Sequence, residues 1–173
     1  MLERTKAWVE TMVIGLNLCP FAKQEWDNNR VRCTVSSAQT PELLLMDLEN
    51  ELVILCNDME VETTLLIHPH TLTVFEDYIA FLDTADALLE HMNLISVFQI
   101  ASFHPHYCFA DVDNNDVTNY TNRAPFPVLH LLREESLARA IDSHHNAQGI
   151  PEDNMALMRK MGILELERML SKH

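Results

Sequence analysis

Cysteine, histidine and arginine side chains recur in a few short segments and together could form a site for a small molecule. Cys19 stands in LNLCPFAK, directly before Pro20. Proline biases the residue before it away from helical geometry and suits the first position of a new helix. We therefore expect Cys19 at a helix N-terminus, where backbone N–H groups lower the pKa of a thiol and favour a nucleophilic, redox or metal-binding role. The alternative is a buried cysteine that packs against its apolar neighbours.

A second candidate segment is His104-Pro105-His106-Tyr107-Cys108. In an extended backbone, residues two apart point to the same side, so both histidines and the cysteine would form a ligand set that suits zinc. Pro105 can bend the chain, and histidines in a turn account for the same residues without a metal. His104 by itself is a candidate general acid or base, because imidazole titrates near neutral pH.

The third candidate segment is NYTNRAPFPVLHLLRE, residues 119–134. Arg123 lies in a polar loop with Asn119 and could hold a carboxylate or phosphate through two parallel hydrogen bonds. We interpret the residues after Pro127 as a helix, on which His130 and Arg133 share one face near an N-terminus that favours anions. The alternative is that both arginines form structural ion pairs with carboxylates.

Composition excludes several classes of function. The 173 residues carry a formal net charge of -14, from 12 lysines and arginines against 26 aspartates and glutamates. Nonspecific nucleic-acid binding needs a basic surface, and so does an anionic membrane, so neither is an expected partner. Three glycines are too few for a glycine-rich phosphate loop. Four cysteines without paired spacing, and a start without a signal peptide, predict reduced thiols and a cytoplasmic protein.

The elements that must position these residues follow from apolar periodicity and from turn residues. Thr40-Pro41 predicts a capped helix start, and Thr73 with Glu76 matches a capping box. We expect helices over 3–18, 41–56, 73–91, 127–142, 151–161 and 163–170, and strands over 31–36, 62–67 and 94–103. This pattern predicts one α+β domain over residues 1–173, with a small sheet covered by helices. The expected architecture is a ferredoxin-like sandwich with extra terminal helices.

The quoted segments resemble, over nearly the whole chain, an uncharacterised bacterial domain family of unknown function that is found mainly in proteobacteria. The resemblance rests on LNLCPFAK, TTLLIHP, QIASFHP, NYTNRAPFP, HLLREES and IPEDN, which occur in this order. It implies a single cytosolic domain and implies no activity. After His104 the family pattern Tyr-Gln-Phe-Ala-Gly-Thr is replaced here by residues 107–112, so His106 and Cys108 are particular to this chain. That difference disfavours the zinc set of the second segment.

We therefore expect one pocket with Cys19, His104 and His130 as catalytic residues and with Asn119, Arg123 and Arg133 as substrate-binding residues. No metal belongs to this set, and no cofactor can be assigned. The first hypothesis is an enzyme that acts on a small anionic metabolite. Two others stay open: a metal-binding protein that uses Cys19 with His104 and His130, and a noncatalytic interaction module. In the last case the terminal helices could form a homodimer.

Overall fold

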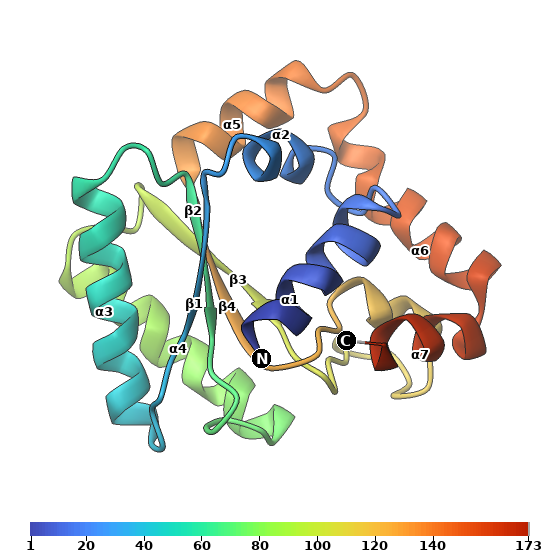
Figure 1. Ribbon diagram of the computed structural model, residues 1–173, viewed down its shortest axis with the longest axis horizontal. Helices are drawn as coiled ribbons and strands as arrows, with labels where there is room; N and C mark the ends of the chain where they lie inside the picture. The colour runs from blue at the N-terminus through green and yellow to red at the C-terminus, as the bar shows by residue number, and fades with distance from the viewer. Residues whose placement is uncertain (173) are drawn as a thin grey trace.

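A four-stranded mixed sheet forms the centre of the fold (Figure 1). The computed structural model describes residues 1–172, and within them the strand order is β1-β2-β4-β3. The strands are β1 (Val31–Val35), β2 (Thr63–Ile67), β3 (Phe98–Phe103) and β4 (Val128–Arg133). β1 and β2 are parallel, whereas β4 runs antiparallel to both of its neighbours. β2 and β4 are therefore the central strands, and β1 and β3 form the edges.

Helices α3 (Pro41–Asn57) and α4 (Phe75–His91) cover one face of the sheet (Figure 1). The hydroxyl of Thr40 accepts a hydrogen bond from the Leu43 amide, with Pro41 at the first helical position, so the predicted start of α3 is confirmed. Leucines three and four positions apart along α3 give it one apolar side. The core between these helices and the sheet contains Leu44, Leu48, Leu52, Leu55, Leu66, Tyr78, Phe81, Phe98, Leu129 and Leu131.

The opposite face carries a second core, formed by segments from both ends of the chain. They are α1 (Leu2–Trp8), a π-helix (Val9–Ile14), a 3₁₀ helix (Val117–Thr121), α6 (Ile150–Met161) and α7 (Ile163–Ser171). Their buried residues pack against alternate residues of the central strands, as strand geometry requires. This second core contains Trp8, Val9, Met12, Leu65, Ile67, Tyr120, Val128, Met158 and Leu166.

Two helices leave part of this second face open. Helix α2 (Ala22–Asp27) precedes β1, and α5 (Glu134–Ser143) follows β4 directly. Neither helix has a fully buried residue. Both helices line a cavity above the sheet, together with α1 and the π-helix. The helices are thus placed as walls of a groove, with the sheet as its floor.

The predicted helix over 127–142 is wrong in its first half, because residues 128–133 form the central strand β4. Leu129 and Leu131 enter the first core, whereas Val128 enters the second. Such alternation is what a strand between two apolar layers requires. His130 and Arg133 therefore do not share a helix face. The helical segment begins only at Glu134, where α5 starts.

The α+β class and the helix-covered small sheet are confirmed. The strand and helix sequence is β-α-β-α-β-β with a parallel β1/β2 pair, which differs from the β-α-β-β-α-β order of a ferredoxin-like sandwich. β3 is shorter than predicted, and Val74 rather than Thr73 precedes α4, without a side-chain cap. Within residues 1–172, no helix has the length and apolar character needed to cross a membrane.

Candidate functional site

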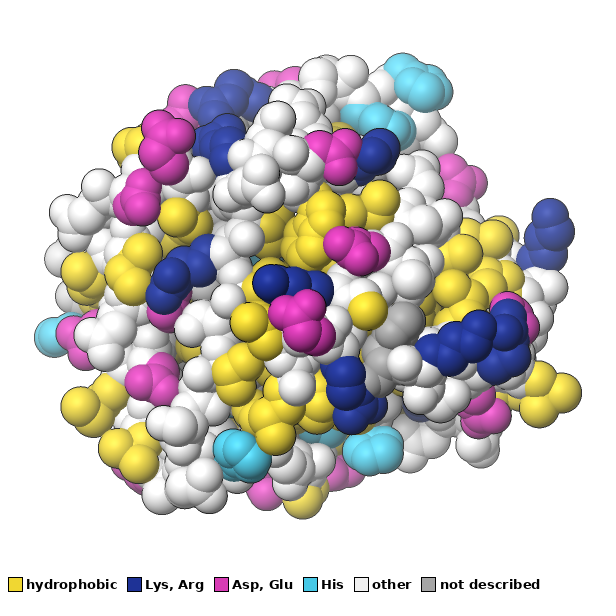
Figure 2. Space-filling view, in the orientation of Figure 1, with side chains coloured by type: hydrophobic (Ala, Val, Ile, Leu, Met, Phe, Trp, Pro, Cys, Tyr) yellow, Lys and Arg dark blue, Asp and Glu magenta, His cyan; other side chains and the backbone are white. Residues whose placement is uncertain are grey.

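The groove over the second face of the sheet encloses a cavity of about 660 Å³. Figure 2 shows hydrophobic side chains at the surface between α1 and α2, bordered by acidic and basic side chains. The lining is mostly apolar and includes Trp8 and Trp26, the two tryptophans of the chain, with Phe21 and Phe103. A cavity of this size with a few polar groups is typical of small-molecule sites in proteins.

The floor of the groove is open beside His130 because its partner on β3 is small. On β4, His130 lies between Leu65 of β2 and Ala101 of β3. The methyl group of Ala101 cannot fill the space above the imidazole, and all three residues line the cavity. The nearest aromatic ring described is that of Phe103, whose centroid is 6.1 Å from that of His130. The imidazole is thus placed in the groove by the register of the sheet.

His130 is held by a short chain of hydrogen bonds. Its Nε2 lies 2.8 Å from the Thr63 hydroxyl oxygen, and that hydroxyl lies 2.5 Å from the carbonyl oxygen of Leu131. Burial lowers the pKa of His130 to about 4, because a charged imidazolium is poorly solvated there. His130 is therefore neutral at physiological pH, a state in which it can accept a hydrogen bond or a proton.

Cys19 also lines the groove, just before α2. The amides of Phe21 and Ala22 act to lower the pKa of its thiol, as the sequence predicts for a helix N-terminus. Burial acts in the opposite direction and is the larger effect, so the pKa of Cys19 is raised. The expected low thiol pKa is thus wrong. Cys19 has an un-ionised side chain in the wall of the groove.

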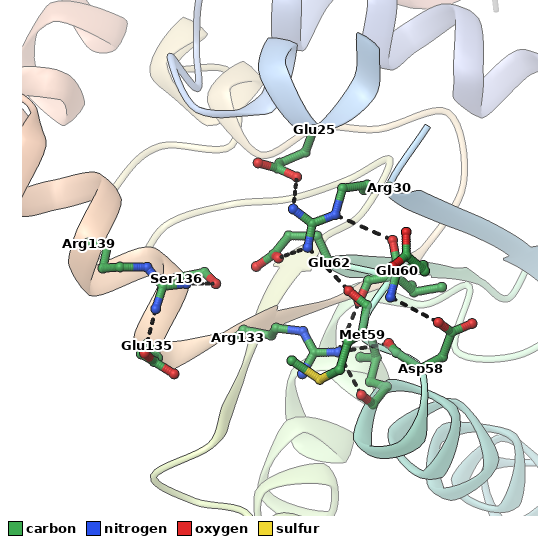
Figure 3. Close-up of polar contacts among 12 residues, drawn as sticks. Glu25, Arg30, Asp58, Met59, Glu60, Glu62, Arg133, Glu135, Ser136 and Arg139 are labelled. Atoms are coloured by element: carbon green, nitrogen blue, oxygen red, sulfur yellow. Dashed lines mark hydrogen bonds and ion pairs between the residues drawn. The ribbon is translucent and has the colours of Figure 1, made fainter. Parts of the chain in front are cut away.

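Arg133 ends β4 at the edge of the groove, but its guanidinium lies on the opposite face of the sheet, where it supports the loop after α3 (Figure 3). One terminal nitrogen donates hydrogen bonds to the carbonyl oxygens of Leu55, Asp58 and Val61, at 2.6, 3.1 and 2.9 Å. Its guanidinium also lies 5.5 Å from the ring centre of Phe98. Nε is buried without a hydrogen-bond partner. Within residues 1–172, no ion pair joins Arg133 to a carboxylate.

Two further arginines line the groove, and neither was among the predicted site residues. Arg30, just before β1, pairs with Glu25 at 3.2 Å and with Glu62 at 2.7 Å (Figure 3). Arg139 on α5 pairs with Glu135, one turn earlier. Of these two lining arginines, Arg30 has two carboxylate partners and Arg139 has one.

His104 is not in the groove. It is fully buried at the end of β3, where its Nε2 lies 3.2 Å from the Leu72 carbonyl oxygen and its Nδ1 accepts the His106 amide at 3.0 Å. Burial is the main cause that lowers its pKa to about 4. Both ring nitrogens therefore have backbone partners. The thiol of Cys108 donates to the Val112 carbonyl instead of pointing toward a shared metal with the histidines.

Arg123 and Asn119 organise the loop that precedes β4 and do not line the groove. Arg123 donates to the carbonyl oxygens of Tyr107 and Asn114 and lies 4.6 Å from the ring centre of Tyr120. Asn119 is fully buried and bonds to the backbone of residues 109 and 113. Their side chains supply hydrogen bonds to backbone groups of the loop between β3 and β4, which has few partners in regular secondary structure.

The structure thus brings together Cys19 and His130, directs the guanidinium of Arg133 to the other face of the sheet, and leaves His104, Asn119 and Arg123 outside the groove. The residues missed by sequence reasoning are Trp8, Trp26, Arg30, Thr63 and Arg139. Arg30 and Thr63 stand at the start of predicted strands, a position from which a side chain can reach the end of a sheet. Tryptophan is rare in this chain, and both copies are here.

Comparison with known proteins gives one match. Residues 1–168 match a protein-family model described as "Protein of unknown function (DUF1415)". The curated proteins and the solved structures contain no match to this chain. The groove itself is therefore the basis for any functional assignment.

Proposed function

Because the chain belongs to a family of proteins of unknown function, DUF1415, we propose its function from the groove alone: it binds a small anionic metabolite with an apolar body. The observation that carries this proposal is an apolar cavity of about 660 Å³ with Arg139 in its lining, an arginine whose carboxylate partner Glu135 is largely exposed. The apolar body would lie against Trp8, Trp26 and Phe103, and the anionic group would lie at the arginines.

The apolar part of the proposal rests on surface that the chain leaves uncovered. The side of α5 that lines the groove carries Leu137 and Ala140, and neither residue is fully buried. Covering apolar surface lowers the free energy of the complex by roughly 25 cal/mol for each Å² removed from water. A ligand between α5, α2 and the sheet would gain this contribution on several sides at once.

The anionic part rests on the charges of the lining. Arg30 is neutralised by two glutamates, and the guanidinium of Arg133 lies on the other face of the sheet, against Phe98, which leaves Arg139 as the arginine for an anion in the groove. The partner of Arg139 is Glu135, whose side chain is 85% exposed. Ion pairs of this exposed kind contribute about 1 kcal/mol or less, so an incoming anion can replace Glu135 at low cost.

Two fluorescent probes test this proposal: anilinonaphthalene sulfonate, which is apolar and anionic, and N-phenyl-1-naphthylamine, which lacks the sulfonate. We expect the anionic probe to bind at least about tenfold more tightly, equivalent to about 1.4 kcal/mol. Arg139→Gln should weaken only the anionic probe. Arg168→Gln is the matched control, because Arg168 is also exposed and pairs with a glutamate on its own helix, α7. Equal binding of both probes would contradict the anionic part.

A second pair of variants locates the probes. Ala140 lines the groove, whereas Ala138 on the same helix is exposed. Ala140→Phe should block both probes, and Ala138→Phe should leave their binding unchanged. Binding that survives Ala140→Phe would place the probes elsewhere and would overturn the proposal.

Catalysis on the bound metabolite is the second candidate function, and the neutral imidazole of His130 on the groove floor favours it. Metal binding by Cys19 with His104 and His130 has less support, since His104 is enclosed elsewhere and Nε2 of His130 bonds to Thr63.

We also propose a cytoplasmic location, because all four cysteines are free thiols.

A further inference from the structure

The hydrogen bonds around Thr63 determine which ring nitrogen of His130 carries the proton. A carbonyl oxygen only accepts, so the contact of 2.5 Å between the Thr63 hydroxyl and the Leu131 carbonyl uses the single hydroxyl hydrogen of Thr63. The hydroxyl oxygen must then accept in its contact of 2.8 Å with Nε2 of His130. Neutral His130 is therefore protonated at Nε2, and Nδ1 carries a lone pair.

Nδ1 of His130 is an acceptor without an intramolecular donor. Within residues 1–172, no hydrogen bond reaches it, and it is not among the fully buried polar atoms that lack a partner. This arrangement contrasts with His104, whose Nδ1 accepts a backbone amide. Because the ring of His130 lines the groove beside the small side chain of Ala101, a bound molecule can reach Nδ1.

We infer that Nδ1 of His130 accepts a hydrogen bond from an O–H or N–H group of the molecule bound in the groove, and that Thr63 is the positioning residue that sets this tautomer. The inference rests on the proposed function and narrows its ligand class to anionic compounds that carry a hydrogen-bond donor on an apolar body.

Imidazole nitrogen NMR of the protein without ligand tests the tautomer. The chain has nine histidines, and the signals of His130 are those lost in His130→Phe, which keeps an aromatic ring at this position. We expect the pattern of an Nε2–H imidazole in the wild type and in Thr63→Ser, which retains the hydroxyl. Thr63→Val keeps the branched shape and should show a mixture of tautomers. An Nδ1–H pattern in the wild type would overturn the inference, and so would an unchanged pattern in Thr63→Val.

Calorimetric titration with 6-hydroxy-2-naphthoate and 6-methoxy-2-naphthoate tests the donor. Both are apolar carboxylates of the same skeleton, and only the first has an O–H group. One neutral hydrogen bond is worth about 0.5–1.5 kcal/mol, so the hydroxy compound should bind about three- to tenfold more tightly to the wild type. In His130→Phe the two affinities should become equal. A preference that persists in His130→Phe would overturn the inference, as would equal affinities in the wild type.

The two proposals fail separately. If neither naphthoate nor the sulfonate probe binds, the proposed function is wrong, and the tautomer measured without ligand still decides the hydrogen-bond arrangement of His130. If the sulfonate probe binds and Arg139→Gln weakens it, but Nδ1 carries the proton, the proposed function stands and the role of His130 is wrong.

Discussion

His104 and His130 lie in two regions of the molecule that differ in how many ring nitrogens of the histidine have hydrogen-bond partners. At the end of β3, His104 is fully buried and both of its ring nitrogens bond to the backbone. On β4, His130 has one occupied nitrogen and faces a cavity. Burial lowers both pKa values to about 4, so a shifted pKa does not distinguish them. The presence of an unoccupied acceptor does distinguish a candidate ligand contact from a structural residue.

The arginines repeat this comparison. Arg123 and Arg133 both donate to carbonyl oxygens, yet only Arg133 lines the groove. Arg123 connects two parts of one loop, whereas Arg133 connects β4 to the segment after α3. The guanidinium of Arg133 nevertheless lies against Phe98 on the other face of the sheet, so its charge is directed away from the groove.

The largest expected effect is the loss of stability in His104→Leu. This substitution leaves the buried carbonyl of Leu72 and the amide of His106 without their partners, at about 1–3 kcal/mol each. We expect the free energy of unfolding to fall by about 2–6 kcal/mol, measured by urea denaturation. His130→Phe is the comparison and should cost about 1.5 kcal/mol or less. Equal losses in the two variants would remove the distinction between the two regions.

The pH dependence of the same substitution should be the next largest effect. The folded pKa of His104, about 4, lies below the unfolded value of about 6.5, so the unfolded chain binds a proton first as the pH falls. The stability contributed by neutral His104 is complete above about pH 6.5 and is lost progressively between pH 6.5 and 4. The destabilisation caused by His104→Leu should therefore be about 1–2 kcal/mol smaller at pH 5 than at pH 7. Identical values at the two pH conditions would show that His104 titrates normally.

The smallest effect concerns the thiol in the groove. Burial raises the pKa of Cys19, whereas Cys56 is exposed at the end of α3. Iodoacetamide should label Cys19 at least about tenfold more slowly than Cys56 at pH 8, as followed by mass spectrometry of peptides, because the thiolate is the reactive form. The anionic probe should slow the labelling of Cys19 further and leave Cys56 unaffected. Rapid labelling of Cys19 at pH 6 would indicate an activated thiol and would favour a catalytic groove.

Local patterns predicted much of the secondary structure. Thr40 and Pro41 begin α3, Gly162 ends α6, and the branched residues of VRCTV form β1, because capping and backbone preferences act between near neighbours. The segment VLHLLR was predicted as a helix, which is wrong, because the spacing of its leucines fits both a helix and a strand. Its pairing with β2 and β3 supplies the hydrogen bonds that make it a strand.

The sequence by itself determined the α+β class, the acidic charge and the short set of residues capable of chemistry. Only the tertiary structure decided which of them meet. Cys19 and His130 come together because α2 and α5 frame the open part of one sheet face. His104, Arg123 and Arg133 were grouped with them in the sequence, but their side chains are bonded to backbone groups from other parts of the chain. Whether a ring nitrogen or a guanidinium is free depends on such long-range partners, which spacing along the chain does not encode.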